Sequence, residues 1–350
     1  MDRNDRRRIG AVIALVVASA FWGLSANARS EEFSFVVVGH LRGEQDDEQF
    51  FLMDELVERV ASLKPNIVFL TGDLIFGDWH RRRVDKNRII AHWDRLDRSL
   101  ARIGSTVYRV PGNHDINDPV TRDIWFQRYG KPPQAISFAG SRFLLLATPF
   151  IPVGNNPPEI PRPHGRVEDL PEDQIDFIRR ELERADDYHH VFLFMHHVVW
   201  WEPERKWWTK VHPLLVGRHV RAVFAGDYGP LKFSHMRRDE IDYFQSALER
   251  RAPARLVRDK LGLGRVVNHQ FDSFLYVQVR DERVDVEVKV IGATSSGKHT
   301  PERFRELLQS APTREPRRGR RLPVVAALIA LGFAGGVAAT WIVARLRRRI

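Results

Sequence analysis

The chain has 350 residues and a formal net charge of +10 at pH 7, and its lack of cysteine excludes disulfide frameworks, thiolate metal sites and cysteine nucleophiles. The charge excess lies in three arginine-rich segments, residues 1–8, 314–321 and 345–349, which carry two, four and four net positive charges. The remainder of the chain is neutral, so the basic segments predict a membrane partner and no nucleic-acid partner.

The N-terminal segment has the features of an export signal. Three arginines at positions 6–8 precede an uncharged apolar run over residues 9–24, and a small-x-small site follows at residues 26–28. This order is typical of a secretory signal peptide, and an uncleaved signal anchor is the alternative. Under either interpretation of residues 1–28, the domain that follows is expected on the exported side, periplasmic or extracellular.

Residues 29–310 are expected to form one α/β domain, because apolar strands alternate with amphipathic helices in its first half. The predicted strands cover residues 33–39, 67–71, 107–110, 135–138, 142–147, 191–195, 220–225, 241–246, 274–279 and 284–291. The predicted helices cover residues 45–63, 88–103 and 171–185. Proline, glycine and asparagine are frequent over residues 152–165, which predicts a long irregular loop.

The C-terminal end is predicted to be a membrane anchor. A basic linker over residues 311–321 precedes an uncharged run of 23 residues, 322–344, which is long enough to span a bilayer as a helix. The basic tail over residues 345–350 is then expected in the cytoplasm. Gly332 and Gly336 form a GxxxG pattern that permits close helix pairing, and hence a homodimer.

Three of the predicted strands lead into residues that can bind a metal ion. The strand over residues 67–71 leads to Gly72-Asp73, and the strand over residues 107–110 leads to Gly112-Asn113-His114-Asp115. The strand over residues 191–195 leads to His196-His197. Carboxylate and amide oxygens, together with imidazoles at the carboxyl ends of strands, suit a hydrolytic metal ion.

The order and spacing of these blocks resemble the calcineurin-like metallophosphoesterases. The resemblance implies an α/β sandwich of two facing mixed sheets flanked by helices, to which the apolar C-terminal run would add a transmembrane helix. It also implies hydrolysis of a phosphate ester at two metal ions that share one bridging carboxylate. Asp73 matches that carboxylate, Asn113 the amide ligand and His196 an imidazole ligand. His114 matches the residue that stabilises charge or protonates the leaving oxygen, with Asp115 beside it.

The chain departs from the family pattern at the first and last blocks. The family has Asp-x-His where this chain has His40-Leu41-Arg42, and Gly-His-x-His where this chain has Gly226-Asp227-Tyr228-Gly229. One metal position therefore loses two ligands, and Arg42 brings a fixed positive charge to it. His40, Arg42 and His197 are candidate ligands or phosphate contacts. The alternatives are a hydrogen-bonded interior histidine for His40, a solvated loop cation for Arg42 and a supporting position for His197.

The other metal position is chemically complete, and its donors are Asp73, Asn113, His196 and Asp227. A carboxylate at Asp227 replaces an imidazole of the family, which suits a harder ion. A turn aspartate that bonds its own backbone is the alternative for this residue. We therefore expect one divalent ion, which could be Mn, Fe, Zn or Mg.

The predicted function is that of a membrane-anchored metallophosphoesterase-like hydrolase with one metal ion. Its location suggests a phosphate ester that could be linked to a lipid. An arginine can bind phosphate but cannot activate water as a metal does. The alternative is therefore a pseudoenzyme, a non-catalytic module on the same fold that binds or senses a phosphate ligand.

Two further sets of residues have open interpretations. Trp200, Trp201, Trp207 and Trp208 would share one face if their segment were helical. They are expected either to pack in the core or to form an aromatic lip beside the site or against lipid. His235 is either a structural residue or a substitute metal ligand.

Overall fold

The computed structural model describes residues 32–43, 49–50, 52–77, 84–153, 156–161, 170–201, 206–227, 233–248, 266–268 and 272–291. The chain divides into two units, Met1–Leu308 and Gln309–Ile350, and every described residue belongs to the first. The predicted signal segment, basic linker, transmembrane helix and tail lie outside the described residues. Among the helices that are described, none is both long enough and apolar enough to cross a bilayer.

The first sheet joins strands from the beginning and the end of the described chain, in the order β14-β13-β1-β2-β3. Its strands are β1 (Phe33–Val38), β2 (Ile67–Thr71), β3 (Thr106–Val110), β13 (Asp272–Arg280) and β14 (Arg283–Ile291). The pairs β1–β2 and β2–β3 are parallel, while β13 is antiparallel to both of its neighbours. Parallel pairing requires crossover connections, and α2 (Met53–Leu63) and α3 (Lys86–Ala101) supply them.

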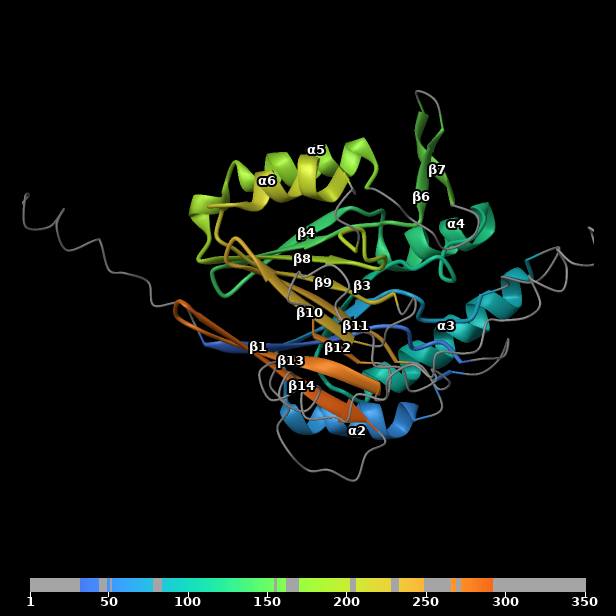
Figure 1. Ribbon diagram of the computed structural model, residues 1–350. Helices are drawn as coiled ribbons and strands as arrows, with labels where there is room; N and C mark the ends of the chain where they lie inside the picture. The colour runs from blue at the N-terminus through green and yellow to red at the C-terminus, as the bar shows by residue number, and fades with distance from the viewer. Residues whose placement is uncertain are drawn as a thin grey trace, which may run out of the picture. The chain divides into compact units, whose positions relative to one another are not determined.

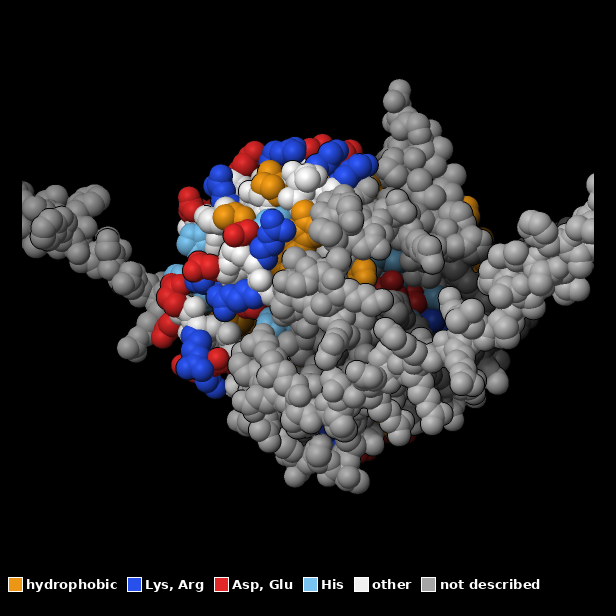
Figure 2. Space-filling model, in the orientation of Figure 1, with side chains coloured by type: hydrophobic (Ala, Val, Ile, Leu, Met, Phe, Trp, Pro, Cys, Tyr) orange, Lys and Arg blue, Asp and Glu red, His pale blue; other side chains and the backbone are white. Residues whose placement is uncertain are grey.

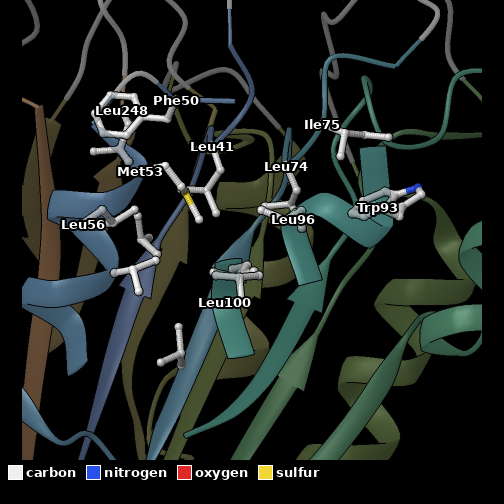
Figure 3. Close-up of a cluster of buried hydrophobic side chains, with 14 of the residues drawn as sticks. Leu41, Phe50, Met53, Leu56, Leu74, Ile75, Trp93, Leu96, Leu100 and Leu248 are labelled. Atoms are coloured by element: carbon white, nitrogen blue, oxygen red, sulfur yellow. The ribbon is translucent and has the colours of Figure 1, made fainter. Parts of the chain in front are cut away.

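Helices α2 and α3 cover the outer face of this sheet, as Figure 1 shows. Figure 3 shows Met53 and Leu56 of α2 and Leu96 and Leu100 of α3 in one apolar cluster, together with Leu41 and Leu74 from the loops beside the site. Burial of each such side chain stabilises the fold by roughly 1.5–3 kcal/mol. The loops that carry the candidate site therefore rest on a packed apolar base.

The second sheet has the order β12-β10-β11-β9-β8-β5-β4. Its strands are β4 (Gln134–Phe138), β5 (Ser141–Leu145), β8 (His190–Met195), β9 (Val220–Ala225), β10 (Phe233–Arg238), β11 (Ile241–Ser246) and β12 (Val266–Asn268). Its outer face is covered by α5 (Glu172–Leu182), a 3-10 turn (Ala185–Asp187), a π-helical turn η2 (Trp207–Val211) and α6 (His212–Leu215). Figure 2 shows acidic and basic side chains interspersed over this region.

The inner faces of the two sheets meet in a core rich in phenylalanine. Phe35 and Phe69 of the first sheet contact Phe143 and Phe194 of the second, and the rings of Phe69 and Phe194 stack with centroids 4.1 Å apart. Offset aromatic stacking adds to the burial of these rings. The prediction of two mixed sheets flanked by helices is confirmed, and so are the strands predicted from residue 33 to residue 147.

The predicted helix over residues 45–63 is too long, because α2 begins at Met53. Gln49 forms an isolated antiparallel bridge with Arg42, and the Phe50 amide donates to the Leu41 carbonyl at 2.7 Å. Phe50 is part of the apolar spacing that predicted a helix, but it does not lie in one. Its side chain is buried in the apolar cluster that contains residues of α2 and α3. The segment of Gln49 and Phe50 holds the backbone of Arg42 in place.

The sequence prediction omitted helix α4 (Pro119–Tyr129). Asp118 caps it by accepting the Thr121 amide at 2.8 Å, and the Thr121 hydroxyl accepts the Asp118 amide at 3.0 Å. Pro119 occupies the first turn, where its missing N–H costs nothing. An N-cap aspartate followed by proline was therefore a usable helix-start signal.

The expectation of an irregular loop over residues 152–165 was wrong for much of its length. Residues Phe150–Val153 and Asn156–Pro161 form the antiparallel ribbon β6–β7. A two-stranded ribbon consists of edges only, so its prolines need not break a ladder. Strands β10 and β12 were also not predicted.

The four tryptophans do not share one helical face. Trp200 lies in the turn after β8, whereas Trp207 and Trp208 lie in η2, and these three residues are at most 7 % exposed. Their rings surround Tyr243 of β11 at centroid distances of 5.3–6.1 Å. Core packing is therefore the correct interpretation for these three residues, and the aromatic lip is wrong for them.

Candidate active site

The candidate site forms where strands of both sheets end. The His40 amide donates to the Gly72 carbonyl at 2.9 Å, and the Arg42 amide donates to the Asp73 carbonyl at 3.0 Å. In the second sheet, the Asp227 amide donates to the His196 carbonyl at 2.7 Å. These backbone bonds join residues that are 31 or 32 positions apart in the sequence. The contact of His196 Nδ1 with the Thr71 carbonyl, 125 positions away, connects the two sheets.

Asp73 is the centre of the site and is only 2 % exposed. Its Oδ1 accepts the His114 amide at 3.0 Å and lies 3.3 Å from His196 Nε2. Its Oδ2 accepts Arg42 Nε at 3.2 Å and lies 3.3 Å from His40 Nε2. Burial alone would raise the pKa of Asp73, but the neighbouring His196, His114 and His40 outweigh burial and hold it well below its usual range. Asp73 is therefore an anion with a different neighbour on each oxygen.

The backbone around Asp73 is close-packed and partly strained. Asp73 and His40 have positive φ angles of 52° and 63°, which cost energy in residues other than glycine. A Cβ added to Gly112 would overlap the amide nitrogen and Oδ1 of Asp73, and one added to Gly72 would lie 2.5 Å from His196 Nδ1. Glycine is therefore required where the strand ends approach each other.

His196 is fully buried and fixed in one tautomer. Its Nδ1 lies 2.8 Å from the Thr71 carbonyl oxygen, which can only accept, so Nδ1 carries the proton. In the neutral ring the lone pair is then on Nε2, which lies 3.3 Å from Asp73 Oδ1 and has no hydrogen-bond partner among the described residues. A cation between Nε2 and Oδ1 would bind both atoms. His197 stands apart from this arrangement, because its Nδ1 lies 2.6 Å from the Thr148 hydroxyl.

His114 is oriented by a backbone carbonyl. Its Nδ1 lies 2.6 Å from the Phe76 carbonyl oxygen, which leaves Nε2 directed to the site, 3.9 Å from Asp73 Oδ2. Burial lowers the pKa of His114 to about 4, so its ring is neutral near pH 7 in the ligand-free protein. A neutral ring with Nδ1 protonated has its lone pair on Nε2.

Asp115 is turned into the backbone of the neighbouring loop. Its carboxylate accepts the amides of Leu74 at 2.8 Å, Ile75 at 3.2 Å and Gly112 at 2.8 Å. Burial raises its pKa to about 7. Asp115 thus ties the loop after β3 to the loop after β2, and it holds Asp73 and His114 in register.

His40 and Arg42 both face Asp73. The His40 side chain is 3 % exposed, and burial, followed by the charge of Arg42, lowers its pKa to about 4. The Arg42 side chain is 18 % exposed, donates from Nη1 to the Gly43 carbonyl at 3.3 Å and lies 5.8 Å from the centroid of the Phe76 ring. The contacts of Arg42 do not fit a solvated loop cation.

The other predicted site residues are Asn113, Asp227 and His235. Asn113 is 7 % exposed and directly precedes His114 in the turn after β3. Asp227 is half-buried, and its carbonyl accepts Gln245 Nε2 at 2.6 Å. His235 lies on β10, where its Nε2 is 2.9 Å from Asp242 Oδ1, so its partner belongs to the sheet. No sequence signal marks Thr71 and Phe76, because they act through their backbone carbonyls.

The donor set fits a single cation in part. Asp73 Oδ1 and His196 Nε2 are 3.3 Å apart, and ligands that bind one ion at about 2.0–2.2 Å lie at such separations. Among the described residues, no group of three or more His, Asp and Glu side chains is disposed to hold a metal ion. The amide of Asn113 would not count toward such a group, but the carboxylate of Asp227 would, so the structure does not bring Asp227 into a group with Asp73 and His196. Asp73 and His196 are the pair that lies at metal-binding separation.

An α/β sandwich with carboxylate, amide and imidazole groups at converging strand ends defines a metallophosphoesterase-type protein. The family model for calcineurin-like phosphoesterases matches residues 35–228, which is more than half of the chain. The chain belongs to the calcineurin-like phosphoesterase family, whose members use divalent metal ions.

Solved structures agree with this assignment at the level of the fold. A dimetal phosphatase from Danio rerio matches with 15 % identity and a TM-score of 0.50, over 77 % of this chain and 98 % of that one. GAP50, the anchor in the inner membrane complex of Plasmodium, matches with 8 % identity and a TM-score of 0.52, over 77 % of this chain and 88 % of that one. No functionally curated protein matches the chain.

Proposed function

We propose that this chain is a membrane-anchored, metal-dependent phosphoesterase that works with one divalent ion. The division of labour between the two oxygens of Asp73 supports this proposal. Oδ1 faces the lone pair of His196 Nε2, whereas Oδ2 is bonded to the guanidinium of Arg42. A metal ion would bind between the two atoms on the first side, whereas the protein supplies its own cation, Arg42, on the second.

Asp73, Asn113, His196 and Asp227 would hold the ion, which could be Mn, Fe, Zn or Mg. When bound, the ion supplies a Lewis acid and lowers the pKa of water. Thr71 keeps the Nε2 lone pair of His196 free for this purpose through the bond to Nδ1. Arg42 and His40 would contact the phosphate, with His197 behind them.

His114 would stabilise charge on the leaving oxygen or protonate it. Its Nδ1 is committed to the Phe76 carbonyl, so Nε2 is the atom that can exchange a proton with a ligand. A bound phosphate beside this nitrogen would raise its pKa from about 4, because a nearby negative charge favours the imidazolium. Asp115 supports the reaction indirectly, by fixing the turn that carries His114.

The attachment to a membrane rests on the amino-acid sequence. The apolar segments over residues 1–28 and 322–344 would hold the domain on the exported side, with the basic tail in the cytoplasm. A phosphate ester linked to a lipid would then be within reach, and Gly332 and Gly336 could pair two chains.

A non-catalytic module that binds a phosphate ligand is the second candidate, and the contact of Arg42 with Asp73 favours it. The test is hydrolysis of an aryl phosphomonoester and an aryl phosphodiester by the full chain in detergent, after loading with each of the four ions. Turnover that disappears with chelator and in Asp73→Asn would support the enzyme. Binding of phosphate without turnover under any loading would favour the second candidate.

A further inference from the structure

The guanidinium of Arg42 uses two of its donors for bonds to described residues. Arginine carries five N–H donors. Nε uses one for Asp73 Oδ2, and Nη1 uses one for the Gly43 carbonyl. The other three, on Nη1 and Nη2, have no partner among the residues that the structure describes. The side chain is 18 % exposed, so it is not sealed off from solvent.

The position of Arg42 is fixed from several sides. Its amide donates to the Asp73 carbonyl at 3.0 Å, and its backbone is bridged to Gln49. The Phe76 ring lies beside the guanidinium, with its centroid 5.8 Å from the central carbon. A cation held in this way loses little conformational freedom when it binds a ligand.

The Nη1–Nη2 edge of Arg42 has the shape and charge that a phosphoryl group requires. The Nη1–Nη2 edge of a guanidinium matches two oxygens of a phosphate, and such charge-assisted pairs are among the stronger hydrogen bonds in proteins. His114 Nε2 and His40 Nε2, both near Asp73 Oδ2, lie on the same side of the site as Arg42. The ligand would therefore meet Arg42 at the oxygen of Asp73 that does not face His196.

We propose that Arg42 is a built-in phosphate-binding cation that lets the chain hold a phosphoryl group when no metal ion is bound. This inference rests on the proposed function, because it concerns the same site. Removal of a metal from the Oδ1 side would leave the bonds of Arg42 to Asp73 and Gly43 in place. Metal binding and phosphate binding are therefore separable properties of this chain.

The test is a titration of orthophosphate into the full chain in detergent, followed by calorimetry. The chain is first stripped with chelator, and ionic strength is held constant. The wild-type chain should bind one phosphate per chain, and Arg42→Gln should abolish binding. Arg42→Lys keeps the charge but loses the second donor of the fork, so its affinity should fall by roughly tenfold or more. Arg179→Gln is the matched control, because Arg179 is exposed on α5 and should leave binding unchanged.

The outcomes separate this inference from the proposed function. Binding of phosphate only by the metal-loaded chain would overturn the role of Arg42 and leave the enzyme proposal standing. Binding of phosphate without metal, combined with no turnover in any metal form, would support the proposed role of Arg42 and favour the non-catalytic module. Equal affinities of wild type and Arg42→Lys would overturn the proposed two-donor contact. The Arg42→Lys variant still tests the proposal if Arg42→Gln does not fold. Acetate at equal concentration should not compete; full competition would make the site a general anion site and overturn the proposal.

Discussion

The two sides of the Asp73 carboxylate are built by different means. On the Oδ1 side the contacts are the backbone amide of His114 and the ring of His196, whose orientation is set by a backbone carbonyl. On the Oδ2 side the neighbours are side chains that carry or can carry positive charge, Arg42 and His40. The Oδ1 side is thus organised largely by backbone groups, and the Oδ2 side by side chains.

The largest effect is expected from removing the charge that both sides share. Asp73→Asn keeps a residue that tolerates positive φ but leaves Arg42 without its anionic partner. The free energy of unfolding should fall by roughly 3 kcal/mol, as for other broken buried ion pairs. Tightly bound metal should also be lost, as measured by elemental analysis. The matched control is Asp123→Asn, an exposed aspartate on α4; unchanged metal content in Asp73→Asn would refute the assignment of Asp73 as a ligand.

Acid should weaken the site through its two neutral histidines. Burial lowers the pKa of His40 and of His114 from 6.5 to about 4, so the unfolded state binds more protons than the folded state between these values. Each histidine should therefore lower the stability by up to roughly 3 kcal/mol as the pH falls from 6.5 to 4, whereas Asp115, whose pKa burial raises to about 7, should offset part of this loss. Urea unfolding of the chelator-treated chain at several pH values measures this slope.

His40→Asn should reduce that slope, because asparagine tolerates positive φ but does not titrate. His219→Asn is the control, since His219 also has a positive φ but is exposed. If His40→Asn and His219→Asn have the same pH dependence as wild type, His40 is not the buried neutral base described above.

A crowding substitution tests the backbone frame separately from its charges. The methyl group added by Gly112→Ala would overlap the amide nitrogen and Oδ1 of Asp73, so the free energy of unfolding should fall by about 2 kcal/mol. Gly104→Ala is the comparison, because it has a positive φ but no atom within 4 Å of the added carbon. Its cost should be about 1 kcal/mol, from the backbone alone. A smaller effect at Gly112 than at Gly104 would mean that the strand ends are not tightly packed.

The smallest effect is expected far from the carboxylate. Asp118→Ala removes the N-cap of α4 and should cost about 1 kcal/mol. Metal content should not change, because α4 supplies no ligand. Thermal unfolding and elemental analysis of the same preparation check both statements. Loss of metal in this variant would show that the frame and the site are coupled over a longer range.

The sequence was most informative where burial and chemistry lie in the same residues. Strands β2 and β3 are apolar and end in Asp73 and in the turn with His114, so both the strands and the blocks could be predicted. The start of α2 could not, because Phe50 is buried from an extended segment. The roles of the Thr71 and Phe76 carbonyls could not be predicted either, because a backbone carbonyl orients an imidazole whatever the side chain of its residue. The burial of Trp207 depends on contacts between distant segments, which spacing alone does not encode.

The number of metal ions per chain tests the central claim most directly. The full chain, purified in detergent and saturated in turn with Mn, Fe, Zn and Mg, should retain at most one tightly bound ion after dialysis, as measured by elemental analysis. One ion is expected because Arg42 occupies the Oδ2 side of Asp73, while His196 Nε2 faces Oδ1 and has no hydrogen-bond partner among the described residues. Two stoichiometric ions in the wild-type chain would contradict the division of the carboxylate between a metal and an arginine.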